Sequence, residues 1–175
     1  AHCKIGCNHF TQGNLMDFET VYQFGKKVDV LTFEIEHVNV EALEKLESEG
    51  VKVYPSSKTL KQIQNKGIQK EFYQQKNLPT APFKKFDSLS ELETAINNQL
   101  VTLPFVWKST CFGYDGNGVK IIRQIADLQN LPTGECIAEN LVPFKNELAV
   151  IVVRNPKGAI KTYPVVEMEF HPEAN

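Results

Sequence analysis

The sequence predicts an α/β fold in its first part and an α+β fold in its second part. In the first part, an apolar strand over residues 28–33, an amphipathic helix over 40–48 and a short strand over 51–54 follow one another, which is the order of a parallel β-α-β unit. In the second part, strands joined by turns predict antiparallel pairing. We therefore expect the tail of a doubly wound domain over residues 1–55, connecting helices over 56–80 and a second, sheet-containing region over 81–175.

Local signals support the two helices of the first part. Asp17 is placed to cap a short helix over residues 18–24, which Gly25 would end. The helix over residues 40–48 has apolar residues on one face and glutamates on the other, and Gly50 would end it.

Two further helices are expected in the connecting region. Ser57 is a plausible N-cap for the first, and Gly67 would separate it from a second helix over residues 69–76. Lys66 and Lys70 lie one helical turn apart. Spacing alone leaves two interpretations of these lysines open, a solvated helix face and a cationic site.

Prolines mark the entry to the second region. Residues 78–82 contain two prolines and cannot be helical, so they predict a stiff linker into a strand over 83–86. Ser88 would begin the next helix, and Glu91, three residues later, completes a capping-box pattern. The other elements we expect are strands over 105–108, 119–123, 136–142, 147–154 and 159–170 and a short helix over 125–128.

The most informative stretch runs from residue 105 to residue 123. An apolar strand ends in Lys108 and would deliver one ammonium group to its open end. Three glycines follow within residues 113–118, where backbone N–H groups could face a phosphate. The alternative is an ordinary hairpin that turns at Asp115 and Gly116. The loop is longer than the tightest hairpin turn, which favours a function, and a calcium loop is disfavoured because its closing glutamate is missing.

Acidic residues lie at two further places of interest. Glu34, Glu36 and His37 follow the strand over 28–33, and ligands bind beyond the carboxyl ends of parallel strands. A solvated strand end is the alternative. Glu139 stands among apolar residues of a predicted strand, where it is either paired structurally or in contact with a ligand.

Composition excludes several classes of protein. The net charge of -2 argues against a nucleic-acid or membrane-surface binder, and no apolar run reaches membrane-spanning length. Cys3 and Cys7 have no second close pair that would complete a zinc site. We therefore expect unpaired thiols of a cytoplasmic protein that binds neither nucleic acid nor membranes.

Six segments together resemble one known family, the ATP-grasp 5-(carboxyamino)imidazole ribonucleotide synthetases of purine biosynthesis. Their order and spacing agree with the family from about residue 28 onward. The segments are residues 32–38 (TFEIEHV), 105–108 (FVWK), 113–118 (GYDGNG), 136–139 (CIAE), 144–147 (FKNE) and 163–164 (YP).

The resemblance implies the tail of a pre-ATP-grasp domain, then the small lobe and the start of the large lobe of an ATP-grasp domain. It implies a ligase that uses ATP and Mg²⁺ to convert bicarbonate into carboxyphosphate. The product is 5-(carboxyamino)imidazole ribonucleotide, made from 5-aminoimidazole ribonucleotide with release of ADP and phosphate. It also implies a cytoplasmic homodimer for the parent protein. Alternatives are another ATP-grasp carboxylate–amine ligase or transformylase, a non-catalytic nucleotide-binding module, and a structural α/β domain.

The resemblance also implies roles for individual residues. Tyr114 and Asp115 would face the aminoimidazole ribonucleotide as catalytic residues, with Glu36 or Glu34 approaching from the first domain. The residues implied in nucleotide binding are Lys66, Lys70 and Lys108 for the phosphates, Gly113, Tyr114, Asp115, Gly116, Asn117, Gly118 and Val119 as the loop above them, Glu139, Asn140, Leu141 and Val142 for adenine, and Glu147 for ribose.

Two residues depart from the family pattern. Lys66 replaces an arginine that contacts ATP, which keeps the charge and loses the bidentate fork. Asn117 replaces a basic residue, so one substrate phosphate contact is affected. The metal ligands of the family are expected beyond Asn175, and we therefore expect the chain to be inactive by itself.

Overall fold

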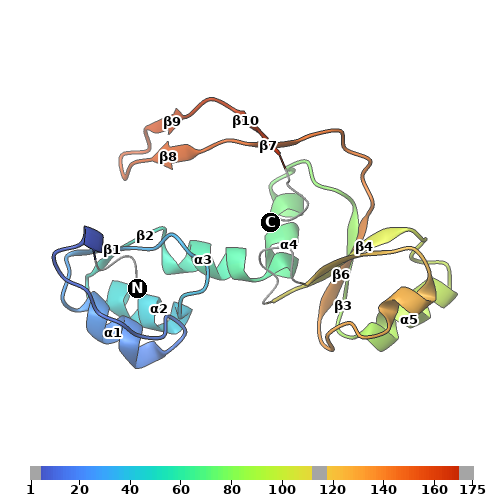
Figure 1. The fold of residues 1–175 in the computed structure, drawn as a ribbon, viewed down its shortest axis with the longest axis horizontal. Coiled ribbons are helices and arrows are strands. Elements are labelled where there is room, and N and C mark those ends of the chain that lie inside the picture. The colour runs from blue at the N-terminus through green and yellow to red at the C-terminus, as the bar shows by residue number, and fades with distance from the viewer. Residues whose placement is uncertain (1–4, 112–117, 170–175) are drawn as a thin grey trace.

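The computed structural model describes residues 5–111 and 118–169. Figure 1 shows an N-terminal unit and a sheet-containing unit connected through α3 and α4, with the C-terminal strands β7–β10 drawn above them and β8 and β9 on the side of the N-terminal unit. The helices are α1 (Phe18–Gly25), α2 (Val40–Ser48), α3 (Ser57–Gln64), α4 (Lys66–Gln75), α5 (Leu89–Asn97) and the 3₁₀ helix η2 (Ile125–Leu128). The strands are β1 (Val30–Thr32), β2 (Lys52–Tyr54), β3 (Phe83–Phe86), β4 (Phe105–Ser109), β5 (Val119–Ile122), β6 (Cys136–Asn140), β7 (Glu147–Ala149), β8 (Val152–Arg154), β9 (Ile160–Thr162) and β10 (Val166–Met168).

The N-terminal unit is built on a parallel strand pair. β1 and β2 pair with Leu31 opposite Val53, and both side chains are buried against the helices. This confirms the predicted β-α-β unit. Its core consists of Val21, Leu31, Val38, Val40, Ala42, Leu43, Leu46, Val53 and Leu60.

Side chains cap the helices of this unit. The Asp17 carboxylate accepts a hydrogen bond from the Thr20 N–H at 2.7 Å, as predicted. Asn39 caps α2 by accepting from the Ala42 N–H at 2.8 Å. Each cap satisfies a backbone donor that the first turn of a helix leaves without a partner.

Two predicted boundaries in the connecting helices are wrong. Ser56, not Ser57, caps α3, and the Ser57 hydroxyl is buried in a hydrogen bond to the Glu47 carboxylate. The break between α3 and α4 falls at Asn65, whose side chain accepts from the Ile68 N–H at 3.0 Å. A good N-cap therefore restarts the helix before Gly67, which lies inside α4.

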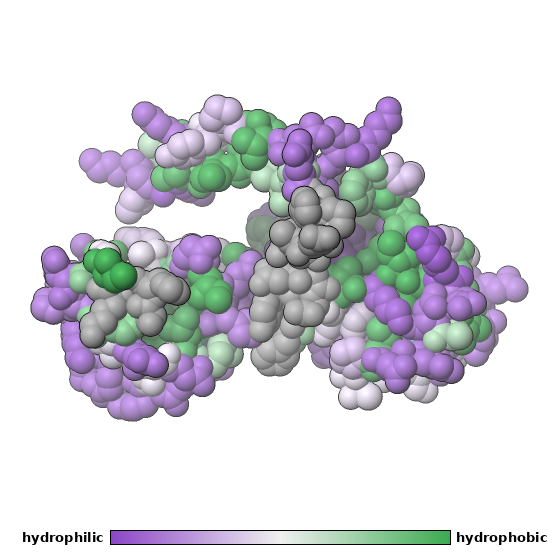
Figure 2. Space-filling model, in the orientation of Figure 1, coloured by the Kyte–Doolittle hydropathy of each residue, from purple (hydrophilic) through white to green (hydrophobic). Residues whose placement is uncertain are grey.

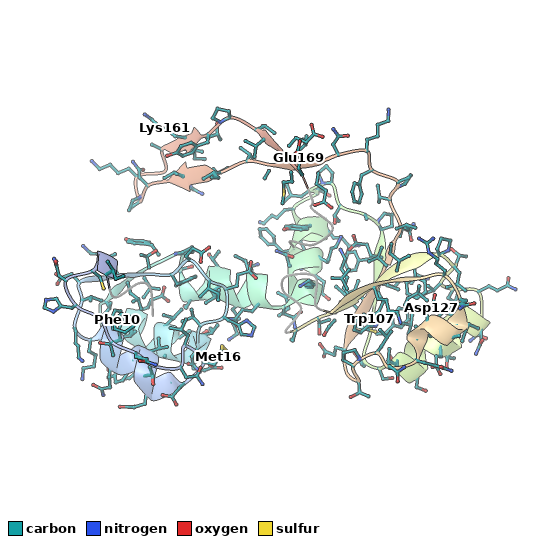
Figure 3. The ribbon with its side chains drawn as sticks, viewed as in Figure 1. Phe10, Met16, Trp107, Asp127, Lys161 and Glu169 are labelled. Carbon is teal, nitrogen blue, oxygen red and sulfur yellow. The ribbon has the colours of Figure 1, made fainter. Side chains whose placement is uncertain are left out.

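The second unit contains a four-stranded antiparallel sheet in the order β3-β6-β4-β5. Figure 1 shows α4 and α5 on opposite sides of this sheet. Because side chains alternate along a strand, one face of the sheet forms a core with α5 and the other faces α4. The buried residues of that core are Leu92, Ala95, Ile96, Val101, Phe105, Trp107, Ile122, Leu128, Cys136 and Ala138. Trp107 and Asp127 are labelled in this unit in Figure 3.

The capping box predicted for α5 is present in a shifted form. The Glu91 N–H donates to the Ser88 hydroxyl at 3.2 Å, as expected. The Glu91 carboxylate accepts from the Asp87 N–H at 2.9 Å instead of from Ser88. The sequence signal therefore predicts the helix start correctly, but the Glu91 carboxylate binds the backbone N–H one residue before the one that an ideal capping box uses.

The long C-terminal strands predicted over 147–154 and 159–170 are each broken in two. β7 pairs with β10, and β8 pairs with β9, all antiparallel. Val152 is three positions after Ala149, whereas Val166 is four positions after Thr162. The segment between β9 and β10 therefore has one residue more than the segment between β7 and β8 that it faces. Pro164, which has no N–H to donate, lies in this interruption. The predicted strand over 136–142 is shorter as well and ends at Asn140.

Large apolar side chains are exposed along these hairpins, and Figure 2 shows them as green surface in the upper part of the molecule. They are Leu148, Val150, Ile151, Val152, Val153, Ile160, Tyr163, Val165, Val166 and Met168. Among the described helices, none has the length and apolar character needed to cross a membrane.

Candidate functional site

The strand β4 places Lys108 on the sheet face opposite the α5 core. Phe105 and Trp107, at alternate positions, are each only 2% exposed within that core. Lys108 points to the other face, where its ammonium lies 3.1 Å from each carboxylate oxygen of Glu139 on β6. The predicted strand is confirmed, although it continues one residue beyond Lys108 to Ser109, and the Lys108 ammonium is held by an ion pair.

A second lysine reaches the same carboxylate from α4. The Lys70 ammonium lies 2.8 Å from Oε2 of Glu139. It also donates to the Thr80 hydroxyl, lies 3.5 Å from the Ala81 carbonyl oxygen, and stands 5.5 Å from the centre of the Phe83 ring. The structure therefore brings together three of the residues predicted to bind a nucleotide, although their role stays a prediction.

The three groups form a cluster with an excess of positive charge. Two ammonium groups and one carboxylate leave one net positive charge, and the Lys70, Glu139 and Lys108 side chains are 10%, 12% and 24% exposed. Charges interact more strongly where water is largely excluded. An anion that reaches this face of the sheet would therefore be attracted.

The glycine-containing loop connects the two strands of a hairpin, β4 and β5. β4 and β5 pair antiparallel, and the Ser109 N–H donates to the Gly118 carbonyl at 2.9 Å where the pairing ends. Gly118 has φ +76°, a conformation that glycine adopts without strain. Val119, the first residue of β5, is 42% exposed. The predicted loop residues Gly113, Tyr114, Asp115, Gly116 and Asn117 lie outside the described residues.

The residues predicted to contact adenine and ribose follow Glu139. The Asn140 N–H already donates to the Pro82 carbonyl at 2.9 Å, and the Val142 carbonyl accepts from Phe144. Leu141 is half-buried. Glu147 is exposed at the start of β7. Their contacts with a nucleotide stay predictions.

A separate cavity of about 320 Å³ brings Glu36 and Lys66 together. Residues from the segment that follows β1, from α2, α3 and α4 and from the segment that follows β4 line it. They include Glu36, His37, Glu41, Lys61, Asn65, Lys66 and Cys111. The Lys66 N–H donates to the Thr110 carbonyl at 2.9 Å, which attaches the first residue of α4 to the segment that follows β4.

The structure distinguishes between the two glutamates predicted to approach the substrate. Glu36 lines the same cavity as Lys66, whereas Glu34 lines a different, mainly apolar cavity of about 310 Å³. The Gln64 side-chain amide fixes the segment around Glu36 by donating to the Glu36 and Val38 carbonyls, each at 2.8 Å. Which of the two glutamates contacts a substrate stays a prediction.

Sequence reasoning missed three residues that position these groups. Thr80 holds the Lys70 ammonium, Gln64 holds the backbone beside Glu36, and Asn65 caps α4. A polar Thr80 between two prolines and an asparagine directly before Lys66 are signals that could have indicated Thr80 and Asn65. Nothing local in the sequence indicates the contacts of Gln64.

A metal centre is not formed by the residues that the structure describes. Within residues 5–111 and 118–169, His, Cys, Asp and Glu side chains make no group of three or more suited to a metal ion.

Comparison with known proteins extends this description. Residues 71–173 match the family model of the ATP-grasp domain. The chain belongs to the ATP-grasp family. Residues 1–64 match a second model, the ribonucleotide synthetase preATP-grasp domain. The pre-ATP-grasp and ATP-grasp composition implied by the sequence is thus confirmed, while the boundaries expected at residues 55 and 80 stay predictions.

Individual relatives of this ATP-grasp chain carry one recurring name. This chain is 38% identical, over 156 residues, to the N5-carboxyaminoimidazole ribonucleotide synthase of Synechocystis. The match covers 87% of this chain and 38% of that relative. Carboxyaminoimidazole ribonucleotide synthase from Aspergillus clavatus, solved in complex with ATP, is 34% identical with a TM-score of 0.84 and covers 96% of this chain and 45% of that one.

A second structure from Aspergillus clavatus contains ADP and 5-aminoimidazole ribonucleotide. It is 32% identical to this ATP-grasp chain, with a TM-score of 0.81, and the match covers 97% of this chain and 45% of that one. The chain thus spans less than half the length of these relatives.

Proposed function

We propose that this protein carboxylates 5-aminoimidazole ribonucleotide with bicarbonate at the expense of ATP, giving 5-(carboxyamino)imidazole ribonucleotide, ADP and phosphate. The observation that carries the proposal is the convergence of Lys70, Lys108 and Glu139 on one sheet face of an ATP-grasp chain. The relatives' printed names and the ADP, ATP and aminoimidazole ribonucleotide in their structures support the choice of substrates.

The chemistry requires a cationic site. The γ-phosphoryl group moves from ATP to a bicarbonate oxygen, which makes carboxyphosphate and ADP. The exocyclic amine then forms an N–C bond to the carboxyl carbon and loses one proton, and the C–O bond breaks so that phosphate leaves. Phosphoryl transfer depends mainly on positioning and on neutralisation of charge. Lys108, at the end of β4, is the group we assign to the polyphosphate.

The cavity lined by Glu36 and Lys66 is our candidate for the second substrate. Its volume of about 320 Å³ is within the usual range of small-molecule sites. A carboxylate and an ammonium group on one cavity suit a substrate that carries both an amine and a phosphate. This assignment departs from the resemblance, which places Lys66 at the phosphates of ATP. Tyr114 and Asp115 stay in the proposal as groups that face this substrate.

The remaining parts of the proposal rest on the resemblance alone. ATP would act as its Mg²⁺ complex, the enzyme would be a homodimer, and its location would be the cytoplasm. Chelation of Mg²⁺, light scattering and cell fractionation test these three points separately.

The test is turnover by the full-length gene product. We expect ATP consumption that requires 5-aminoimidazole ribonucleotide and bicarbonate together, and we expect Lys108→Met to weaken ATP binding by at least about tenfold, because it removes a charge that pairs with phosphate. Turnover with a different amine or with formate would assign another ATP-grasp reaction. ATP binding without turnover would indicate a non-catalytic nucleotide-binding module. No binding at millimolar ATP would refute the proposal.

A further inference from the structure

The two lysines of the cluster are held in different ways. Lys70 is tied to Glu139, to Thr80 and to the Ala81 carbonyl, and it is only 8% exposed. Lys108 is more exposed, and Glu139 is the polar partner that the structure gives it among the described residues. The two ammonium groups are therefore not equivalent.

The strand register puts Lys108 closer to the end of β4 than the residue that lies opposite Glu139. Val106 is the residue of β4 directly opposite Glu139, whereas Lys108 stands opposite Ile137. Lys108 thus reaches back diagonally to the carboxylate, over a spacing that long side chains can bridge. A rotation of its side chain away from Glu139 would carry the ammonium toward the end of β4, where the glycine-containing loop begins.

We propose that Lys70 is the resident counter-ion of Glu139, and that Lys108 is an exchangeable one that leaves Glu139 for the polyphosphate of a bound nucleotide. This rests on the proposed function, and it differs from assigning both lysines to phosphate. Lys70 then acts as a positioning residue: it holds the carboxylate and touches no phosphate.

The physical reason lies in the cost of an uncompensated buried charge. If Lys108 were the sole partner of Glu139, its departure would leave a carboxylate that is 12% exposed without a counter-ion. Lys70 prevents this, because its ammonium stays on Oε2 of Glu139 and is held there by two further partners, the Thr80 hydroxyl and the Ala81 carbonyl. Lys108 can therefore change partners at little cost.

A double-mutant cycle on the full-length gene product tests this. The variants are Lys70→Met, Glu139→Gln, the double variant and Lys108→Met, which removes the proposed phosphate contact. Affinity for ATP is measured by calorimetry, and circular dichroism checks that each variant is folded. Lys84→Met is the matched control, because Lys84 lies on β3 of the same sheet and its ammonium contacts the Leu100 carbonyl instead.

We expect Lys70→Met to weaken ATP binding at least about fivefold, because Lys108 becomes the only counter-ion of Glu139 and is retained there. In the double variant, Glu139→Gln removes the carboxylate charge that retains the Lys108 ammonium. ATP affinity in the double variant should therefore return to within about twofold of Glu139→Gln alone, and Lys84→Met should have no effect.

Three results would overturn the inference while leaving nucleotide binding intact. The first is a loss of ATP affinity in Lys70→Met that Glu139→Gln does not rescue. The second is unchanged ATP affinity in Lys70→Met, and the third is unchanged ATP affinity in Lys108→Met. Absence of ATP binding by the unsubstituted protein would instead refute the proposed function. If Lys70→Met does not fold, Thr80→Val replaces it, since this variant loosens Lys70 without removing its charge, and the same rescue is expected.

Discussion

At the scale of single residues, backbone N–H groups stabilise the carboxylate form of Asp127 at the start of η2. Its carboxylate accepts hydrogen bonds from the Arg123 N–H at 2.8 Å and from the Gln124 N–H at 3.1 Å. These bonds favour the ionised form, and the bond to Arg123 contributes most to holding the pKa of Asp127 below its ordinary value. Asp127 thereby closes the turn between β5 and η2.

This lowered pKa predicts a pH dependence of stability. A carboxyl group whose pKa is lower in the folded state stabilises the fold above its unfolded pKa of about 4, and that stabilisation disappears as the pH falls through the folded pKa. We therefore expect Asp127→Asn to lower the free energy of unfolding at pH 7 and to have a smaller effect near pH 3. Urea unfolding of both proteins at the two pH values measures this, and an equal difference at both would contradict it.

At the scale of elements, local patterns predicted what local interactions decide. Asp17 and Ser88 cap the helices they were expected to cap, because a cap needs only its own backbone neighbours. The same reasoning chose Ser57 over Ser56, since both are good caps and only the contact with Glu47, ten residues earlier, separates them. The interruption at Pro164 could have been expected from its missing N–H, although not the extra residue beside it.

Packing between α1 and α2 gives a prediction at this scale. Gly25 ends α1 against Leu46, and a Cβ atom added to Gly25 would come within 2.2 Å of Leu46 Cδ1. Leu46 is fully buried in the first core, so it has little room to move aside. We expect Gly25→Ala to lower the free energy of unfolding by about 1–3 kcal/mol, as overpacked cores do.

Chemical denaturation measures this change. Glu19→Ala is the control, because Glu19 lies in the same helix with an exposed side chain. A neutral or stabilising Gly25→Ala would show that the two helices separate readily. The packing of α1 on α2 would then be looser than their contact suggests.

At the scale of the whole molecule, the candidate site depends on contacts that no local pattern contains. Lys70, Lys108 and Glu139 come from α4, β4 and β6, and only the fold brings the two ammonium groups within 2.8 and 3.1 Å of the Glu139 carboxylate. The resemblance to a family nominated all three residues, yet it did not reveal that they pair with each other. In the same way, Glu36 and Lys66 share a cavity because the parallel pair, α3 and α4 lie next to one another.

The two separate hydrophobic cores lead to a prediction about cooperativity. Leu43 belongs to the first core and Leu92 to the second, and both are completely buried. The chain has one tryptophan, Trp107, which lies in the second core. Tryptophan fluorescence therefore reports the unfolding of the second core, while far-ultraviolet circular dichroism reports both.

We expect Leu43→Ala to destabilise the first core by about 2–5 kcal/mol, so that part of the dichroism signal is lost at lower urea while the fluorescence transition stays in place. Leu92→Ala is the matched substitution in the other core, and it should move the fluorescence transition. A fluorescence shift of equal size in Leu43→Ala would contradict the prediction, because it would show that α3 and α4 couple the two cores into one cooperative unit. In that case a ligand in the cavity lined by Glu36 and Lys66 would stabilise both cores together. If the cores unfold independently, the same ligand would stabilise a core only through the residues of that core that it contacts.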